Sequence, residues 1–225
     1  MSDDQSGFAL AELVVAMTVG LIVLMAAFLL LDRAHSVSNE ISDRQDAVQR
    51  GRQAMETLTR QIRSQVCLGN TIEPITYGSA DQVTFYADLT DGSKNVERRN
   101  IVFDPDTKTI TEEVFPGVGV YPDLTFGSTP TESRVILSRA ERVLGPPTPF
   151  LRYYAYDPSG APGALRELNT PLSADDAPLV VMVKIAFVAM PEGAKPRDRD
   201  ATTFYNDVYV RLANPTVPTQ GPRCL

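Results

Sequence analysis

The sequence has few of the residues from which common catalytic and metal sites are built. Its 225 residues include one histidine, His35, and two cysteines, Cys67 and Cys224, and no further cysteine or histidine completes a metal-ligating motif. Phosphate-binding glycine loops and the short motifs of serine hydrolases and zinc peptidases are also missing. We therefore expect no catalytic residues, no cofactor and no zinc site, and the composition does not indicate an enzyme.

Positive charge is also scarce. The chain carries 21 basic and 28 acidic residues, for a formal net charge of −7. A chain of this charge is not expected to bind nucleic acid through a general attraction to phosphates. Hydrophobic residues make up 43% of the sequence, which is enough for a core. The length allows one ordinary domain plus an appendage.

Proline is missing from the first 73 residues, and all 17 prolines lie at or beyond Pro74. Because proline costs about 3 kcal/mol in a helix interior, the N-terminal third is free to form one continuous helix. We predict this helix over residues 8–66. The rest of the chain is divided by prolines, as is typical of a β domain rich in loops.

One long hydrophobic run occupies residues 8–31, and Glu12 is its only ionisable residue. A helix of roughly 24 residues is roughly 36 Å long, which matches the hydrocarbon core of a bilayer. A cleaved secretory signal is one interpretation. However, the preceding "MSDDQSG" has two acids and no base, the run is too long, and "MAA" at residues 25–27 is a weak cleavage site.

Glu12 is the feature that a plain membrane anchor does not explain. A carboxylate near the centre of a membrane helix costs about 2.5–3.5 kcal/mol, and less where its side chain reaches the interface. A third interpretation gives Glu12 a partner on another chain, because no Lys, Arg or His of this chain lies within reach. A free α-amino group on a neighbouring subunit would serve, if cleavage before Phe8 exposed one.

Gly7, then Phe8, then Glu12 as the fifth residue from Phe8, then the apolar run, resemble the cleavage and methylation signal of type IV pilin-like proteins. In that family a prepilin peptidase cuts after the glycine and methylates the new N-terminal residue. The resemblance implies that Gly7 and Phe8 form the cleavage site, that Phe8 is methylated, and that Glu12 acts in assembly. The acidic leader departs from the basic leaders of the family, so either translation starts upstream of Met1 or other cues, such as cleavage itself, set the orientation in the membrane.

Beyond the apolar run the sequence becomes amphipathic without a break. Apolar residues recur at three- and four-residue steps, which predicts that the helix continues and packs on a sheet; they are Ala34, Val37, Ile41, Val48, Met55, Leu58 and Ile62. Arg44, Gly51 and Gln65 interrupt this stripe. A coiled-coil dimer is the alternative. Five acids and six arginines lie between the stripe residues, on a face that is either solvated or in contact with other subunits.

From Thr71 onward the periodicity changes to two, which predicts an antiparallel sheet or pair of sheets. The predicted strands are Gln82–Asp88, Arg99–Asp104, Lys108–Phe115, Arg134–Ala140, Phe150–Asp157, Leu179–Met190 and Thr203–Leu212. The strand at residues 179–190 does not alternate strictly, so we expect it to be central and covered on both faces. "DPDT" at residues 104–107 is either a solvated turn or a weak calcium ligand set.

The two cysteines fit an exported domain. Cys67 lies at the end of the predicted helix and Cys224 is the penultimate residue. A disulfide between them would close a loop of roughly 160 residues and stabilise the fold by roughly 4–5 kcal/mol. It requires an oxidising compartment. Two free thiols are the alternative.

These expectations combine into an α+β, pilin-like fold. We divide the chain into a leader at 1–7, a transmembrane helix at 8–31, an amphipathic helix at 32–66 and a β-rich domain at 67–225 with a proline-rich tail. The order of elements, including "RQAMETLTRQIRSQVC", "FLRYYAYDPSG" and "NDVYVRLANP", resembles the larger minor pilins and the J-type minor pseudopilins of type II secretion.

The resemblance implies a minor subunit of a type IV pilus, or of a secretion or competence pseudopilus, acting in initiation or at the tip. Its partners would be the prepilin peptidase, other pilin subunits, the assembly platform and motor, and the bacterial cytoplasmic membrane, with the globular domain outside the cytoplasm. The alternative is a single-pass anchored β domain that acts as an adhesin or binds a ligand without polymerising. A membrane-tethered enzyme is a third class, supported only by the generic β domain.

Overall fold

The computed structural model describes residues 10–69, 72–88, 96–143, 148–161, 163–192 and 201–210. The chain divides into two compact units, residues 1–43 and residues 44–225, and each is described by itself. The helix α1 spans Leu10–Arg63 and contributes to both units. This agrees with the helix predicted over residues 8–66, and the first two residues of that prediction lie outside the described part.

The second unit contains two antiparallel sheets. The first has the order β1 (Ile75–Gly78), β2 (Gln82–Ala87), β3 (Glu97–Asp104), β4 (Thr109–Val120) and β5 (Asp123–Phe126), with β6 (Glu132–Ser138) also paired to β4. The second has the order β11 (Thr202–Tyr209), β10 (Met182–Ala189), β8 (Leu151–Tyr156) and β9 (Leu165–Leu168), with β7 (Ala140–Glu141) paired to β10. A short 3-10 helix, η1, covers Ala177–Leu179.

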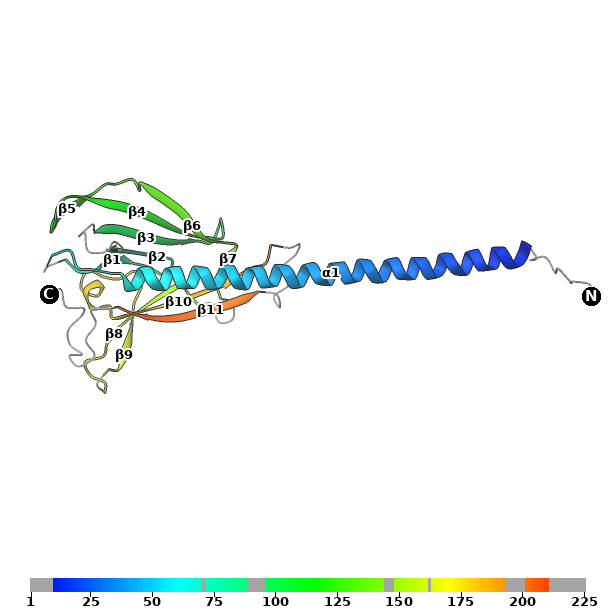
Figure 1. Cartoon of the computed structure of the whole chain (residues 1–225). Helices are drawn as coiled ribbons and strands as arrows, with labels where there is room; N and C mark the ends of the chain where they lie inside the picture. Colours follow the sequence, from blue (N-terminus) through cyan, green and yellow to red (C-terminus); the bar gives the residue numbers. More distant parts are fainter. Residues whose placement is uncertain are drawn as a thin grey trace, which may run out of the picture. The chain divides into compact units, whose positions relative to one another are not determined.

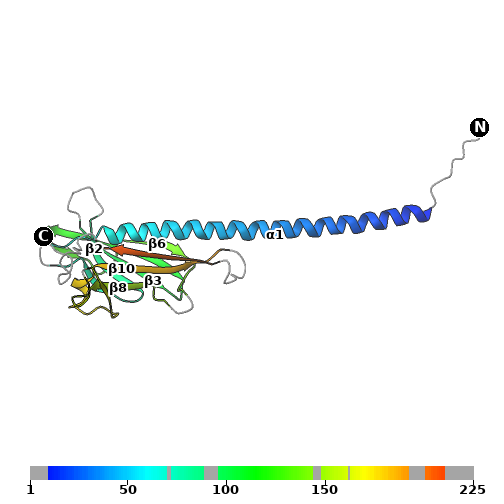
Figure 2. The same ribbon diagram turned by 90° about the horizontal axis from the view of Figure 1, so that it is seen from below.

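Both sheets pack against the C-terminal part of α1 (Figure 1). Figure 2 shows the same part of the helix from below, with the strands of the second sheet running along it. Leu58 and Ile62 of α1 are almost fully buried in a core that both sheets share. Burial of this apolar surface is the main force that holds the helix on the sheets.

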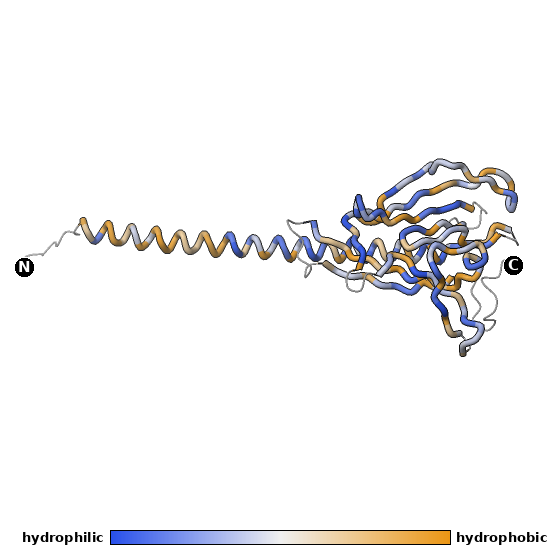
Figure 3. Tube along the Cα trace, turned by 180° about the vertical axis from the view of Figure 1, so that it is seen from behind, coloured by the Kyte–Doolittle hydropathy of each residue, from blue (hydrophilic) through white to orange (hydrophobic). Residues whose placement is uncertain are grey.

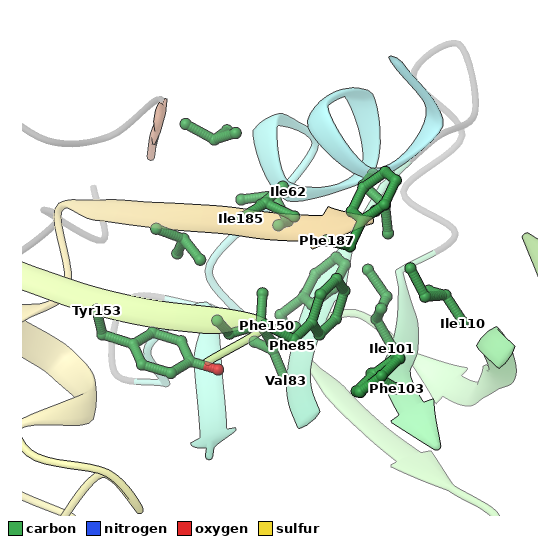
Figure 4. Packing of buried hydrophobic residues seen from close by; sticks show 14 of the residues in the cluster. Ile62, Val83, Phe85, Ile101, Phe103, Ile110, Phe150, Tyr153, Ile185 and Phe187 are labelled. Carbon is green, nitrogen blue, oxygen red and sulfur yellow. The ribbon is translucent and has the colours of Figure 1, made fainter. Parts of the chain in front are cut away.

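Aromatic rings connect the two sheets through the core (Figure 4). Phe103 of β3 contacts Phe150 with ring centroids 5.6 Å apart, and Phe150 contacts Phe187 of β10 at 6.4 Å. Phe187 stacks on Phe204 of β11 at 5.4 Å. The hydroxyl of Tyr153 on β8 donates a hydrogen bond to the carbonyl of Gln82 at 3.0 Å, which adds a polar link between the sheets.

The buried stripe of α1 agrees with the predicted one at its C-terminal end, where Leu58 and Ile62 are buried, and differs from it elsewhere. Its buried residues are Ala47, Gly51, Ala54, Leu58, Gln61 and Ile62, whereas the side chains of Ala34, Val37 and Ile41 are exposed. Gly51 and Gln65 were predicted to interrupt the stripe, and both are buried. The prediction was wrong here because hydropathy alone does not show that a glycine fits beneath an aromatic ring or that a glutamine lies against a strand end.

The seven predicted strands are confirmed as β2, β3, β4, β6, β8, β10 and β11. β10 is central, since β11 pairs with one edge and β8 and β7 with the other, and every residue of it except Lys184 is buried. The sequence did not predict β1, β5, β7 and β9, which have four residues or fewer.

Candidate membrane and assembly site

The carboxylate of Glu12 lies in the first turn of α1. Negative charge is favourable there, because unpaired backbone N–H groups give the N-terminus of a helix a partial positive charge. The side chain is exposed, and among the described residues no hydrogen bond or ion pair reaches it. Glu12 is therefore available to a group supplied by another molecule.

Around and beyond Glu12, residues 10–31 present apolar side chains on all faces of the helix. The large ones are all exposed: Leu10, Leu13, Val14, Val15, Met17, Val19, Leu21, Ile22, Val23, Leu24, Met25, Phe28, Leu29, Leu30 and Leu31. Figure 3 shows this segment as the mainly hydrophobic part of the helix. Its length and hydropathy suit a membrane span. An apolar surface of this extent anchors the chain in a bilayer.

Besides Glu12, one polar residue, Thr18, and one glycine, Gly20, lie inside this segment. The hydroxyl of Thr18 donates to the carbonyls of Val14 and Val15, each at 2.9 Å. The helix itself therefore satisfies this hydroxyl, as hydrocarbon requires. A Cβ built on Gly20 meets nothing within 4 Å, so this glycine is not required for packing within the chain.

The other predicted functional residues are only partly placed. Gly7, Phe8 and Cys224 lie outside the described residues. Cys67 is half-buried just beyond the end of α1 and is not a free thiol. The structure thus positions Glu12 and Cys67 and leaves the cleavage site and the predicted disulfide partner as sequence-based predictions.

A groove of about 640 Å³ lies between the last turns of α1 and β11. It is lined by Met55, Glu56, Thr59, Arg60, Arg63, Ser64 and Asn206. The Asn206 amide donates to the Thr59 hydroxyl at 2.7 Å and joins the two walls. Within the described part of the chain, neither Arg60 nor Arg63 forms an ion pair. We call this feature the α1–β11 groove.

A buried ionic cluster fixes the end of α1 over the first sheet. The side chain of Glu112 on β4 is fully buried and accepts hydrogen bonds from Arg99 of β3, Arg134 of β6 and Gln61 of α1, the last at 2.5 Å. Arg99 also pairs with Glu97 at 2.5 Å. Sequence reasoning missed this cluster, although Glu112 falls at the same two-residue spacing as Ile110 and Val114, the buried residues on either side of it on β4.

The turn at residues 104–107 is built by its own aspartate. The Asp104 carboxylate accepts hydrogen bonds from the backbone N–H groups of Asp106 at 2.8 Å and Thr107 at 3.3 Å. Hydrogen bonds from the Thr107 side chain and from these N–H groups lower the pKa of Asp104. Among the described residues no group of three or more His, Cys, Asp or Glu side chains could hold a metal ion.

Burial raises the pKa of the tyrosine hydroxyls on β8, and Tyr154 is the one among them that is bonded to a carboxylate. The Tyr154 hydroxyl of β8 donates to the Glu167 carboxylate of β9 at 2.8 Å. Desolvation, followed by this hydrogen bond, raises the pKa of Tyr154 to about 12. Lys184 of β10 lies 5.2 Å from the centre of the Tyr154 ring and 3.4 Å from the Asp207 carboxylate of β11. These groups hold strands β9, β8, β10 and β11 together on the face of the sheet away from the core.

Comparison with known proteins identifies one feature of the chain. Residues 3–28 match the family described as the prokaryotic N-terminal methylation motif. The match includes Gly7, Phe8 and Glu12 and ends inside the exposed apolar segment of α1. No curated protein matches the chain.

Proposed function

We propose that this chain is a prepilin-type pilin, and within that class a minor pilin or pseudopilin; a prokaryotic methylation motif at the start of a long apolar helix supports this. It is made as a membrane precursor, processed by a prepilin peptidase, and assembled with other pilin subunits by a platform and motor. Initiation or the filament tip is its place of action. The chain is a structural subunit in this proposal and not an enzyme.

The processing site is the bond between Gly7 and Phe8. Cleavage gives Phe8 a free α-amino group, which the peptidase methylates. A methylated amine stays protonated at neutral pH and is a suitable partner for a carboxylate. Glu12 of one subunit then pairs with the Phe8 amine of its neighbour. This role is supported by the exposure of Glu12 and by the missing partner for it among the described residues.

The apolar surface of the membrane segment has to be covered both before and after assembly. Before assembly this surface is covered by lipid, in which it is stable. In a filament the same surface is buried against the helices of other subunits, which offsets the loss of lipid. The exposure of large apolar side chains on all faces of residues 10–31 supports contacts with several neighbours at once.

The β-rich unit is the extracytoplasmic part of the subunit in this proposal, and a single membrane pass connects it to the bilayer. A disulfide between Cys67 and Cys224 would tie the C-terminal tail to the end of α1 in that oxidising compartment. The finding that Cys67 is not a free thiol supports this pairing.

The match of residues 3–28 to the methylation motif is the observation on which this function depends. Intact-mass measurement of protein extracted from membranes tests it. We expect the mature chain to lack residues 1–7 and to carry one added methyl group on Phe8. The same chain from cells without the peptidase, and a Gly7→Val variant, should both keep the full precursor mass.

An unprocessed chain in cells that contain the peptidase would contradict the filament function. It would favour a single-pass anchored β domain that binds a ligand without polymerising. The minor status has its own test, quantitative mass spectrometry of purified filaments. We expect far fewer copies of this chain than of the main subunit, and equal numbers would refute that status.

A further inference from the structure

The edge strands of the two sheets are protected to different degrees. β1, β5 and β9 have four residues each, and the pairing of β1 with β2 shifts register between Ile75 and Tyr77. β6 has seven residues, but its pairing with β4 shifts register beside Ile110, and it carries Arg134. Short strands, irregular pairing and charged side chains are the usual means by which a native sheet keeps its edges from binding other strands.

β11 is the edge strand without these protections. It pairs with β10 alone among the described residues. Its eight residues, TTFYNDVY, contain no proline, glycine or lysine, and all of them pair with β10 without a shift of register. Its one charge, on Asp207, lies 3.4 Å from Lys184 of β10. A long, regular edge rich in threonine, tyrosine and other strand-forming residues is one that a natural protein covers.

Every second residue of β11 turns its backbone groups toward this open edge. Ala186 of β10 pairs with Tyr205, yet its N–H donates to Phe150 on the β8 side. The hydrogen bonds of an antiparallel strand alternate between its two sides. The residues of β11 whose N–H and C=O groups point away from β10 are therefore Thr203, Tyr205, Asp207 and Tyr209.

Side chains that suit a further strand lie on both sides of this edge. On the outer face of the sheet, Tyr205 and Tyr209 are 60% and 52% exposed. On the face toward α1, the edge borders the α1–β11 groove, where Asn206 donates to Thr59 beside the half-buried Met55. Figure 2 shows β11 running beside this part of α1. A strand added to β11 would bury its alternate side chains against the tyrosines and against the groove.

The charges of the groove favour an occupant with a carboxylate. Arg60, Arg63 and Glu56 line it, which leaves one excess positive charge. Within the described part of the chain none of the three forms an ion pair. Because a guanidinium binds a carboxylate through two parallel hydrogen bonds, an acidic side chain of the occupant fits beside either arginine.

We propose that β11 binds an extended segment of a different subunit of the filament, which adds to the second sheet as a further strand. The segment pairs with the backbone of residues 203–209 and carries an acid beside the arginines of the groove. This inference rests on the filament function proposed above and names a heteromeric contact within it. The occupant is a different subunit because copies of a low-abundance chain seldom meet, and because the open edge borders α1, the helix that enters the filament.

Proline substitution tests the backbone pairing. Tyr205→Pro and Asp207→Pro each remove an N–H from the open edge and keep those that bond to β10, and an edge strand tolerates proline in such a position. The matched controls Tyr205→Ala and Asp207→Ala remove the same side chains and keep the N–H. The full-length chain is purified through a tag from cells with the assembly machinery, and mass spectrometry measures the filament subunits recovered with it.

We expect recovery of one different subunit to fall by about tenfold or more with each proline, because a carbonyl of the added strand is left unpaired. The loss with each alanine should be less than about threefold, since the backbone hydrogen bond is kept. Equal losses in the proline and alanine variants would overturn the proposal, because the open backbone would then have no part in binding.

Photo-cross-linking tests the same contact with every backbone N–H in place, so it remains decisive if a proline variant does not fold. p-Benzoylphenylalanine at position 209 should link to a different chain whose N-terminus is cleaved and methylated. The same group in place of Val135, which is 57% exposed on β6, should give little of this product. Links only to a second copy, to residues 211–225 of the same chain or to unprocessed proteins would refute a filament subunit as the occupant, as would the absence of any link.

This contact and the filament function can fail separately. A chain that is processed and incorporated, but does not respond to the proline substitutions, would leave the filament function intact and reject the contact. A chain that keeps residues 1–7 in cells with the peptidase would reject the filament function itself.

Discussion

Gly51 of α1 lies directly beneath the ring of Phe204 on β11. A Cβ built on this glycine would lie 2.2 Å from Cε2 of Phe204 and 2.4 Å from Cζ. The ring is held in place by stacking on Phe187. A residue that weakens a helix in isolation is therefore what allows α1 to approach the edge strand of the second sheet.

Replacing Gly51 by alanine should lower the free energy of unfolding by about 1 kcal/mol. The added methyl displaces the Phe204 ring, which costs about 1–3 kcal/mol, while the better helix propensity of alanine returns up to about 1 kcal/mol. Denaturant unfolding of the full-length protein in detergent, followed by tyrosine fluorescence, measures the change.

Gly20→Ala is the matched control for this substitution, because nothing lies within 4 Å of its added Cβ. It should not lower the stability of the isolated chain. A second substitution, Phe204→Leu, should reduce the cost of Gly51→Ala, since the two sites are in contact. Independent effects of the two substitutions would contradict the packing described here.

The buried carboxylate of Glu112 provides a second prediction. Glu112→Gln should lower the free energy of unfolding by about 2–3 kcal/mol, because it leaves the Arg99 and Arg134 guanidiniums without their shared anion. The cost is below the usual range for a buried pair, since the Arg134 side chain is 47% exposed and water replaces part of the interaction. Denaturant midpoints measure it.

The neighbouring residue gives a control for Glu112. Glu113 lies on the other face of β4 and accepts a hydrogen bond from Asn100 at 2.8 Å. Glu113→Gln keeps the hydrogen-bonding shape at a partly exposed site and should cost less than about 1 kcal/mol. Equal effects of the two substitutions would show that the ionic cluster has no special role.

The sequence predicted most of the regular structure because its long patterns are simple. The absence of proline before Pro74 and the hydrophobic periodicity predicted α1, and alternation predicted seven strands with β10 at the centre of its sheet. Short strands such as β9 have too few residues for alternation to be recognised. They form because a neighbour already provides a hydrogen-bonding edge, which no local pattern reveals.

The candidate site likewise has one part that the sequence predicted and one part that only the structure shows. Glu12 was found because a carboxylate within an apolar run can be recognised from the sequence alone. The α1–β11 groove was not, because it exists only where β11 lies beside Thr59 and Arg60, more than a hundred residues earlier in the chain. The six arginines of the helix were seen in the sequence, but the groove that two of them, Arg60 and Arg63, line depends on tertiary packing.

The Tyr154 hydroxyl on β8 predicts that the stability of the fold depends on pH in the alkaline range. The pKa of Tyr154 is raised in the folded state from about 10 to about 12. Its contribution to stability is therefore fully present below pH 10 and is lost as the pH rises from about 10 to about 12. Tyr154→Phe should lose stability less steeply than wild type over that range. Denaturant midpoints at pH 8, 10 and 11 measure this difference.

Absorbance of the phenolate gives an independent measure for Tyr154. Glu167→Gln removes the charge that accepts its hydrogen bond and should lower the pKa of Tyr154 toward 10, with part of the shift kept because desolvation remains. Identical titration curves for wild type and this variant would contradict the assigned cause.

The proposed disulfide predicts equal effects of two distant substitutions. Cys67→Ser and Cys224→Ser should each lower the free energy of unfolding by about 4 kcal/mol, and the double variant should cost no more than either one. Alkylation without a reducing agent should label neither cysteine of the wild type. Labelling of both thiols, or additive effects of the two substitutions, would show that no such bond exists.

Glu12 separates membrane insertion from assembly. Glu12→Gln removes the charge but keeps a side chain of the same size, so insertion should be unchanged or slightly improved. Incorporation into filaments should fall at least tenfold, because a neutral amide cannot neutralise the methylated amine of the next subunit. Quantitative mass spectrometry of the membrane and filament fractions measures both. Thr18→Ala is the control, since the hydroxyl of Thr18 is already bonded within its own helix and its loss should leave assembly unchanged. If Glu12→Gln assembled as well as Thr18→Ala, the carboxylate would have no part in joining subunits.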